Sequence, residues 1–385
     1  MIDEKILTPL NAKTPEERLA NLRTLAKDAT FPETDRRYIN NHIHTIYSFS
    51  PYSPTAAVWA AKAEGLATAG IVDHDSIGGA EEFLEAGKIL DMPVTIGMEC
   101  RVSMVGTPFE TLRTNNPDQP GVSYMTMQAV PHGSIGMLQA AFEPLRAKRE
   151  NRNRKMIANI NTVLDGTGVM LDYDADVRPL SEAEVGGSVT ERHLMLALAR
   201  KLIAGFGKDG IVEGLASVGV SLSEKQCVLM RDTESPYFEY DLLGILKGAF
   251  VKKIYIPATD ECLHITEAAK LASDAGALFC YAYLGDVTDS VTGDKAAQKF
   301  EDDYLDELVK FLSDTGVKGI TYMPTRNTPA QLDRIRALAD KCGLMQVSGE
   351  DINSPRQSFI VKAMENPKFE NLIGSAWELI RRENA

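Results

Sequence analysis

The sequence predicts an α/β protein with a parallel sheet or barrel that is interrupted by a mostly helical insertion. Segments typical of strands and of helices alternate from residue 38 onwards, which favours repeated β–α units. The alternation stops near residue 136 and resumes near residue 256. A chain of 385 residues with 44% hydrophobic and 25% charged content has the composition of a globular protein with a large core.

The first 34 residues are expected to form a helical extension. In "KTPEERLANLRTLAKDA", Thr14 is a typical N-cap, Pro15 occupies the first helical position, and Glu17 follows the cap by three residues. The stretch "TFPETD" then ends this helix, so that residues 1–34 are predicted to precede the barrel.

The barrel is predicted to occupy residues 35–135 and 256–385. In its first part we expect strands and helices in turn at residues 38–46, 55–64, 68–73 and 79–90, followed by the strand "PVTIGMEC". After "VSYMTMQAV" the hydrophobic period becomes helical, and residues 136–255 are predicted to be an insertion that acts as a lid. The alternation returns with the strands "ALFCYAYL", "VKGITYM" and "LMQVSGED", each preceded by a predicted helix.

The charge and cysteine content exclude several classes of function. A formal charge of −13 argues against a stable grip on nucleic acid or an anionic membrane, because both need clustered Lys and Arg. Five scattered cysteines without a C-x-x-C pair suggest neither disulfides nor a zinc knuckle. The first residues lack the build of a signal peptide, and no run approaches 18 apolar residues. We therefore expect a cytoplasmic protein; the sequence does not indicate its oligomeric state.

Two of the six histidines lie two residues apart in "YINNHIHTIYSFSPYS". Because residues i and i+2 of a strand point to the same face, His42 and His44 are expected to lie side by side. Two neutral imidazoles that face one cavity begin a site for a divalent transition metal. The alternative is a pair of exposed histidines on an edge strand.

Further polar residues fall at the ends of predicted strands. The carboxyl ends of parallel barrel strands share one rim, so these residues are expected to converge there. Mixed nitrogen and oxygen ligands suit Zn, Mn or Fe better than Mg or Ca. Competing roles are a helix cap for "DHDS", an Asx turn for "GEDINSP" and ordinary loop chemistry around "PHGS". The candidates are Asp73, His74, Asp75, Glu99, His132, Glu350 and Asp351.

Four motifs together resemble the PHP (polymerase and histidinol phosphatase) superfamily. "NNHIHTIYSFSP" is similar to its H-x-H motif, "GIVDHDSIGGAEEF" to its D-H-D motif and "TIGMECRVS" to its G-x-E strand. The segment "DTGVKGITYMPTRNTPAQLDRIRALADKCGLMQVSGEDIN" is similar to its penultimate helix and final strand. Within the superfamily, the helical insertion resembles that of the small-nucleotide phosphoesterases.

The resemblance implies a distorted (β/α)7 barrel with one to three divalent metal ions (Mn, Zn or Fe) at its mouth, which hydrolyses a small phosphorylated substrate, such as a nucleotide, with a metal-activated water. It implies the metal ligands His42, His44, His74, Glu99, His132, His193 and Asp351. Of these, Glu99, Asp351 and His193 would also be catalytic, and Arg192 and Arg326 would contact the phosphate. Asp73, Asp75 and Asn353 would orient the ligands as their hydrogen-bond partners.

Two positions depart from the family pattern. Ala282 in "CYAYLG" and Asn353 in "GEDIN" stand where ligand histidines are expected, so one of the metals would be weakly held or absent. Tyr281 and Tyr283 flank the first position and offer an oxygen in its place, although plain packing explains them equally well. The competing hypotheses are an amidohydrolase-like metal hydrolase, which also begins with H-x-H, and a non-catalytic PHP relative with a partly decayed site.

Overall fold

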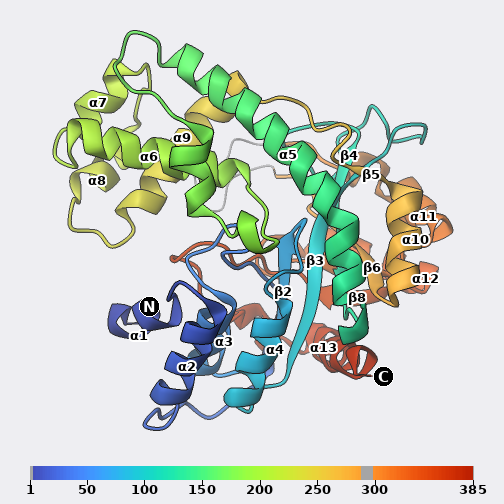
Figure 1. The fold of residues 1–385 in the computed structure, drawn as a ribbon. Coiled ribbons are helices and arrows are strands. Elements are labelled where there is room, and N and C mark those ends of the chain that lie inside the picture. The colour runs from blue at the N-terminus through green and yellow to red at the C-terminus, as the bar shows by residue number, and fades with distance from the viewer. Residues whose placement is uncertain (1–2, 288–297, 385) are drawn as a thin grey trace.

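A computed structural model describes residues 3–287 and 298–384 of the chain, and Figure 1 shows its fold. Seven strands form a curved sheet in the order β1-β2-β3-β4-β6-β7-β8. A bridge between Ile43 and Ile352 joins the two edges, so the sheet is nearly closed into a barrel. This confirms the predicted α/β fold. The strands are β1 (Asp35–Ile43), β2 (Leu66–His74), β3 (Val94–Ser103), β4 (Val122–Gln128), β6 (Leu278–Ala282), β7 (Gly319–Tyr322) and β8 (Met345–Ser348).

One strand of the barrel runs against the others. The pairs β1–β2, β2–β3, β6–β7 and β7–β8 are parallel, whereas β4 is antiparallel to both β3 and β6. The short strand β5 (Leu263–His264) adds to β3 in parallel. The carboxyl ends of the parallel strands therefore form one rim, and β4 ends at the opposite end of the barrel.

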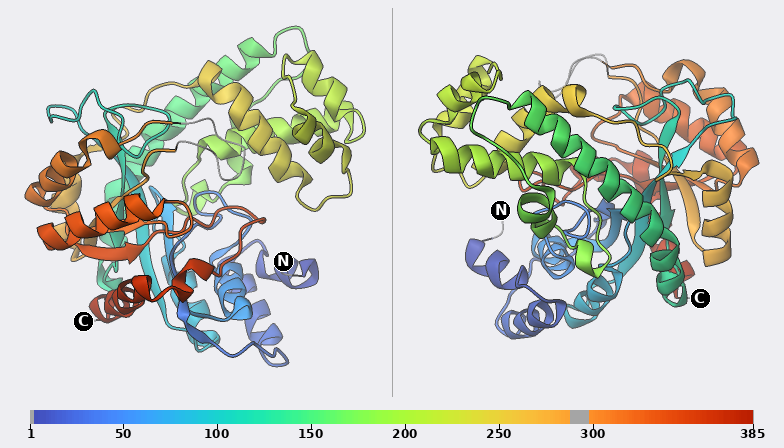
Figure 2. Two further views of the ribbon diagram at one scale, coloured as in Figure 1. Left: turned by 180° about the vertical axis from the view of Figure 1, so that it is seen from behind. Right: turned by 45° about the horizontal axis from the view of Figure 1, so that its top comes forward.

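Helices cover the outside of the barrel and one of its ends (Figures 1 and 2). At the end where the parallel strands begin, Leu379 of the last helix packs with Leu278 and Val347. On the same helix, Glu383 accepts hydrogen bonds from Thr95 Oγ1 at 2.6 Å and from Ile96 N at 2.7 Å. The helices of the barrel are α3 (Pro54–Glu64), α4 (Ala80–Ile89), α10 (Ile265–Ala275), α11 (Leu305–Thr315), α12 (Pro329–Cys342) and α13 (Glu370–Glu383).

The N-terminal helices α1 (Glu4–Leu10) and α2 (Pro15–Leu25) pack beside α3 and α4. The predicted cap is confirmed, because Glu17 N donates to Thr14 Oγ1 at 3.3 Å and Thr14 N to Glu17 Oε2 at 3.2 Å. Arg18 of α2 makes two hydrogen bonds, of 2.9 and 2.6 Å, to the buried carboxylate of Glu82 on α4. This buried ion pair fastens the extension to the barrel.

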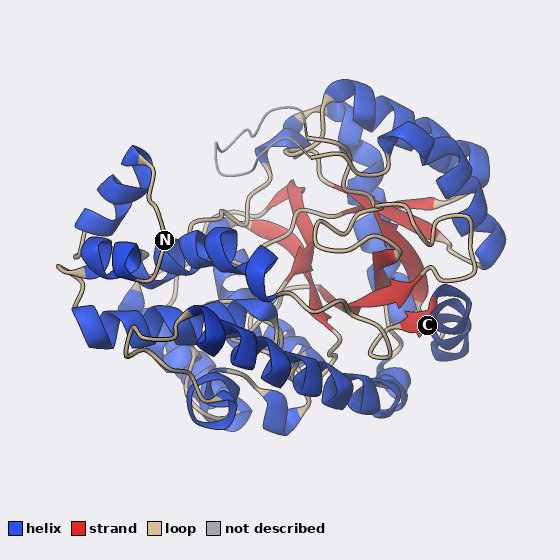
Figure 3. Cartoon of the chain, turned by 90° about the horizontal axis from the view of Figure 1, so that it is seen from above, coloured by secondary structure: helices blue, strands red, loops and turns tan. Residues whose placement is uncertain are grey.

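The helices between β4 and β5 gather over the rim where the parallel strands end (Figures 1 and 3). They are α5 (Ile135–Val163), α6 (Glu191–Phe206), α7 (Ile211–Ser217), α8 (Glu224–Arg231) and α9 (Phe238–Ile254). The 29-residue helix α5 packs its first half into the barrel core and its second half into a separate hydrophobic core with α6 and α9. The domain bounds 35–135, 136–255 and 256–385 remain predictions. No helix within the described residues combines the length and apolar character needed to cross a membrane.

Candidate metal centre

Closure of the barrel brings the ends of β1 and β8 together. His44 N donates to Ile352 O at 2.9 Å, and Ile352 N donates to His42 O at 3.0 Å. This pairing places Asp351 beside the H-x-H segment, so that Asp351 Oδ1 lies 3.4 Å from His44 Nε2. Residues more than 300 positions apart in the chain thus meet because the first and last strands are neighbours.

The next two strands contribute a histidine and a carboxylate to the same place. His74 and Glu99 are paired in the register of β2 and β3, and His74 Nδ1 lies 3.0 Å from Glu99 Oε2. The Nε2 atoms of His42 and His44 lie 3.6 and 3.7 Å from the same carboxylate oxygen. Three imidazoles therefore surround the carboxylate of Glu99.

Two groups of three potential ligands result from this convergence. In each group, three donor atoms lie within 4.8 Å of one another. The groups are His42, His44 and Asp351, and His44, His74 and Glu99. Each offers two imidazole nitrogens and one carboxylate, a set that suits divalent Zn, Mn or Fe.

The hydrogen bonds of Asp73 determine the tautomer of His44. Ser48 Oγ donates to Asp73 Oδ1 at 2.6 Å, and Thr45 donates to the same carboxylate through its backbone N and its hydroxyl, both at 2.6 Å. Because the hydroxyl proton of Ser48 is committed to Asp73, its oxygen accepts from His44 Nδ1, 3.3 Å away. The proton of the neutral imidazole is then on Nδ1, and Nε2 carries a free lone pair.

This lone pair has no hydrogen-bond partner among the described residues, although His44 is only 1% exposed. A buried acceptor without a partner is costly. Its surroundings are carboxylates, which donate nothing when ionised. A cation is the partner that satisfies both the nitrogen and the carboxylates, so the residues fit a divalent metal.

The protonation states of His44, Glu99 and Asp351 favour metal binding, whereas Glu99 raises the pKa of His42 against the effect of burial. Burial, aided by the neighbouring His74, lowers the pKa of His44 to about 3, so the imidazole is neutral at ordinary pH. Burial tends to raise the pKa of Glu99, but His74 and His42 outweigh it and hold the pKa of the carboxyl well below its usual range. Asp351 behaves similarly, since His44, His42 and Arg192 lower the pKa of its carboxyl against the effect of burial.

Asn353 and Glu350 flank Asp351 in different ways. Asn353 Nδ2 donates to Asp351 Oδ1 at 2.7 Å, and thereby orients the carboxylate. Glu350 instead accepts from Thr325 N at 2.7 Å and Thr325 Oγ1 at 2.6 Å, which ties the last strand to the loop after β7. Asn353 thus lies where a hydrogen-bond partner of a ligand was predicted.

His132 is a predicted ligand that the structure does not bring to the cluster. Its Nε2 lies 3.0 Å from Glu383 Oε1 of α13, at the end of the barrel where the parallel strands begin. The prediction placed His132 on the common rim because it follows a strand. That strand, β4, is antiparallel, so its end faces the other way.

The predicted phosphate contact Arg326 is engaged elsewhere. It lies in the loop after β7, where its Nε donates to Leu284 O at 3.2 Å, and no contact places it against the metal ligands among the described residues. Asp75 orients no imidazole either, because its carboxylate accepts from Arg149.

Neither of the tyrosines beside Ala282 offers a ligand in place of the histidine expected at that position. Tyr281 OH donates to Glu301 Oε1 at 3.2 Å, and Tyr283 OH donates to Asp302 Oδ1 at 2.6 Å. Both hydroxyls are therefore used in the outer layer of the barrel. Ala282 itself offers only its carbonyl, which accepts from Asn115 Nδ2 at 2.6 Å.

His193 lies in the first turn of α6, packed edge-on against Phe49 with 5.0 Å between ring centres. Burial lowers the pKa of His193 to about 3, so its imidazole is neutral. Thr190 N donates to His193 Nδ1 at 3.0 Å, which leaves the ring proton on Nε2. In this arrangement Nε2 is a hydrogen-bond donor, and the expected role of His193 as a metal ligand does not fit.

A pocket lies between the metal ligands and the helices above them, with a water-accessible volume of about 60 Å³. Arg192, the residue before His193, lines this pocket. The negative charge of the Asp351 carboxylate tends to raise the pKa of the Arg192 guanidinium group. Sequence reasoning missed several lining residues, which come from separate parts of the chain: the loop after β1, β4 and the loop before it, and the helices α5, α6 and α9. These residues are Phe49, Asp118, Tyr124, Arg149, Thr190, Glu191, Lys247 and Val251.

Comparisons with known proteins agree with the fold. No family model matches the chain. Error-prone DNA polymerases of Mycobacterium bovis and Mycobacterium tuberculosis are 33% identical over 98 residues, which is 25% of this chain and 8% of the polymerases. The chain thus spans less than a tenth of these curated relatives.

Two solved structures share the fold over most of the chain. An amidohydrolase from Chromobacterium violaceum, solved with bound sulfate and no metal, has a TM-score of 0.54 and 18% identity, covering 83% of this chain and 89% of that one. A protein of Bifidobacterium adolescentis, described as a candidate metal-dependent phosphoesterase, has a TM-score of 0.52 and 19% identity, covering 90% and 100%. These structures thus share the fold of this chain, and its two ligand clusters have the composition and spacing to hold a divalent metal.

Proposed function

We propose that this protein is a PHP-type phosphoesterase that hydrolyses a small phosphorylated metabolite with the help of divalent metal. The main support is the unpartnered Nε2 of His44, which lies among the carboxylates of Glu99 and Asp351 in a residue that lines the same pocket as Arg192. A bound metal would be the missing partner of this nitrogen and of the carboxylates. The guanidinium group of Arg192 would attract an anion into the pocket.

Within this proposal, His42, His44, His74, Glu99 and Asp351 would hold one or two metal ions. A bound divalent metal supplies Lewis acidity, which makes a water reactive and offsets charge on phosphate oxygens. Ser48 and Asp73 keep the lone pair of His44 directed at the metal, and Asn353 fixes the carboxylate of Asp351.

The helical region would supply the groups that face the phosphate. Arg192 would hold the phosphate oxygens by charge-assisted hydrogen bonds. The Nε2 proton of His193 would serve as a donor to an oxygen of the phosphate or of the leaving group. Since this imidazole is neutral and already bonded at Nδ1, it donates without adding charge to the site.

We further propose that the substrate is small, and a nucleotide is one class that fits. The rings of Phe49 and Tyr124 line the pocket beside His44 and His74 and offer flat apolar surface to a leaving group. The pocket volume of about 60 Å³ accommodates a few water molecules, so a large substrate would extend out of it.

The experiment measures metal content and phosphate release together. Purified protein is analysed for Mn, Zn and Fe, and is then assayed with phosphomonoesters, cyclic phosphodiesters and amides in added Mn²⁺. We expect bound transition metal, phosphate release from at least one ester, and loss of both in His44→Ala. His264→Ala is the matched control, because His264 is bonded to Thr266 and Val105 outside the cluster.

The results also decide between the competing functions. Amide hydrolysis without phosphate release would favour an amidohydrolase, the class named for the Chromobacterium violaceum structure. Absence of both metal and activity would favour a non-catalytic relative, which the replacement of a ligand by Ala282 supports. Activity that survives in His44→Ala would contradict the proposed mechanism.

A further inference from the structure

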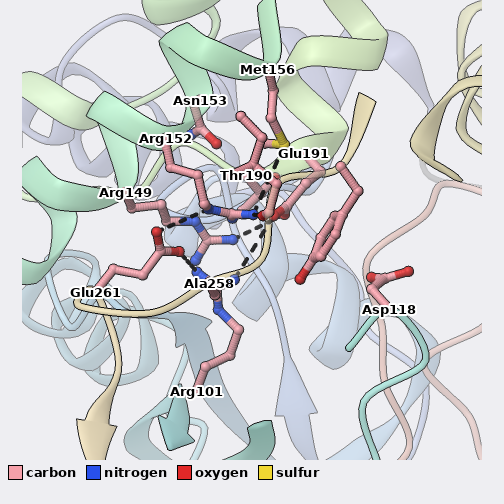
Figure 4. Close-up of polar contacts among 12 residues, drawn as sticks. Arg101, Asp118, Arg149, Arg152, Asn153, Met156, Thr190, Glu191, Ala258 and Glu261 are labelled. Carbon is pink, nitrogen blue, oxygen red and sulfur yellow. Dashed lines mark hydrogen bonds and ion pairs between the residues drawn. The ribbon is translucent and has the colours of Figure 1, made fainter. Parts of the chain in front are cut away.

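A buried network of three arginines and three carboxylates joins the helical region to the barrel rim. Figure 4 shows its arginines together with Glu191 and Glu261. The arginines are no more than 5% exposed, and they come from β3 and α5. The carboxylates come from the turn after β2, the start of α6 and the loop before β5. The members are Arg101, Arg149, Arg152, Asp75, Glu191 and Glu261.

Glu191 is the member that meets all three arginines. Its carboxylate accepts from Arg152 Nη2 at 2.5 Å and from Arg149 Nη2 at 3.1 Å, and it lies 3.9 Å from Arg101 Nη1. Burial tends to raise the pKa of Glu191, but the three guanidinium groups hold it well below its usual range, so the carboxylate is ionised.

The other carboxylates complete the pairing. Asp75 accepts from Arg149 and lies 3.9 Å from Arg101. Glu261 accepts from Arg101 and lies 2.9 Å from Arg152 Nε. The network is therefore neutral as a whole. Buried ion pairs add little net stability. We therefore interpret the network by the positions in which it holds the segments that it joins.

The network touches the proposed metal centre through the chain itself. Asp75 directly follows His74, and Arg101 lies two residues beyond Glu99 on the same face of β3. Glu191 directly precedes Arg192 at the beginning of α6. The same ion pairs thus hold the segments that carry two ligands and the segment that carries the phosphate-facing guanidinium.

Arg192 is consequently fixed from both sides. Before it, the side chain of Glu191 is held by the arginines of α5; after it, His193 accepts from the backbone of Thr190. The loop that leads to this turn is held as well, since Asn153 Nδ2 donates to Val189 O at 2.8 Å. An arginine side chain is flexible, and its usefulness depends on a fixed backbone.

We propose that Glu191 is a positioning residue, whose ion pairs with Arg149, Arg152 and Arg101 hold Arg192 over the metal centre so that it receives the phosphate. This inference rests on the proposed function. Loss of the Glu191 charge would leave the network with an extra positive charge and free the first turn of α6. Binding of phosphate would then weaken, whereas the proposed metal ligands, which lie on the strands or directly after them, would remain in place.

The test compares Glu191→Gln with the wild type in Mn²⁺-loaded protein. Calorimetry measures the affinity for Mn²⁺ and for inorganic phosphate, and steady-state assays separate KM from kcat. We expect roughly tenfold or greater weakening of phosphate binding and a matching rise in KM, the scale of one lost charge-assisted hydrogen bond. Mn²⁺ affinity should stay unchanged. Glu239→Gln is the matched control, because Glu239 forms an exposed pair with Arg200 on α9 and α6.

A second variant addresses folding. Arg152→Met together with Glu191→Gln restores the charge balance, and this double variant should fold while still binding phosphate weakly. Glu191→Asp, which keeps the charge, should recover part of the affinity. Equal phosphate affinity in wild type and both Gln variants would overturn the positioning role alone. Parallel loss of Mn²⁺ and phosphate affinity would also overturn it. A wild type that neither binds nor releases phosphate would refute the proposed function itself, and the inference with it.

Discussion

The buried carboxyl of Glu301 makes a quantitative prediction about the pH dependence of stability. Its Oε1 atom accepts from Leu284 N at 2.8 Å and from Tyr281 OH at 3.2 Å, whereas Oε2 has no partner among the described residues. Glu301 is fully buried, and desolvation raises the pKa of its carboxyl from 4.5 to about 7. Folding therefore favours the protonated form.

The sign and size follow from proton linkage. Below pH 4.5 the carboxyl is protonated in both the folded and the unfolded chain, so its ionisation does not change the free energy of unfolding. Between pH 4.5 and about 7 only the unfolded chain loses the proton, so the free energy of unfolding falls as the pH rises. At 1.36 kcal/mol for each pH unit, the total loss is about 3 kcal/mol and is complete above pH 7.

Glu301→Gln removes the ionisation and retains the shape. The amide oxygen can still accept from Leu284 N, and the NH2 group takes the place of Oε2. We expect the variant to gain up to about 3 kcal/mol relative to the wild type at pH 8, and to differ from it by less than about 1 kcal/mol at pH 4.5. Urea unfolding at both pH values measures the difference.

Glu307→Gln is the matched control, because Glu307 is an exposed residue on the adjacent helix α11. It should follow the wild type at both pH values. The reasoning would be refuted if Glu301→Gln differed from the wild type by the same amount at pH 4.5 and at pH 8, since the carboxyl would then ionise alike in both states.

Three further predictions concern the ion pair of the N-terminal extension and the metal centre. Arg18→Met leaves the buried carboxylate of Glu82 unpaired and should destabilise the protein by about 3–5 kcal/mol in urea unfolding, whereas adding Glu82→Leu should recover most of the loss. Ser48→Ala removes the hydrogen-bond partner of His44 and should weaken Mn²⁺ binding by about 10–100-fold in calorimetry; unchanged affinity would contradict the tautomer argument. Asn353→His places an imidazole beside the cluster, and mass spectrometry should find more metal per chain than in the wild type.

Local sequence patterns were sufficient for most of the fold. The cap of α2 depends on residues three positions apart, and the alternation of strands and helices repeats at short range, so both were visible before the structure. The direction of β4 was not visible. An antiparallel strand has the same internal pattern as a parallel one, and only its neighbours β3 and β6 distinguish them.

The same distinction between local strand geometry and strand direction applies to the candidate site. His42 and His44 share a face because of strand geometry, and His74 and Glu99 meet because consecutive parallel strands end together. His132 was misplaced because this rule fails for the antiparallel β4. The sequence could thus predict which side chains lie together at the rim, but only where strand direction followed the common pattern.

The groups proposed to face the phosphate depend on a different kind of contact. Glu191 reaches Arg149 and Arg152 only because α5 and α6 pack with a particular rotation, and each of these side chains has the appearance of an ordinary charged helix residue. Arg149 and Arg152 are nevertheless buried, although most of the charged residues around them on α5 are not. The strands that carry the proposed metal ligands and the helix that carries Arg192 are joined by buried ion pairs. Substitutions in the network should consequently alter phosphate binding without altering the metal centre, which allows the two parts of the proposed mechanism to be tested independently.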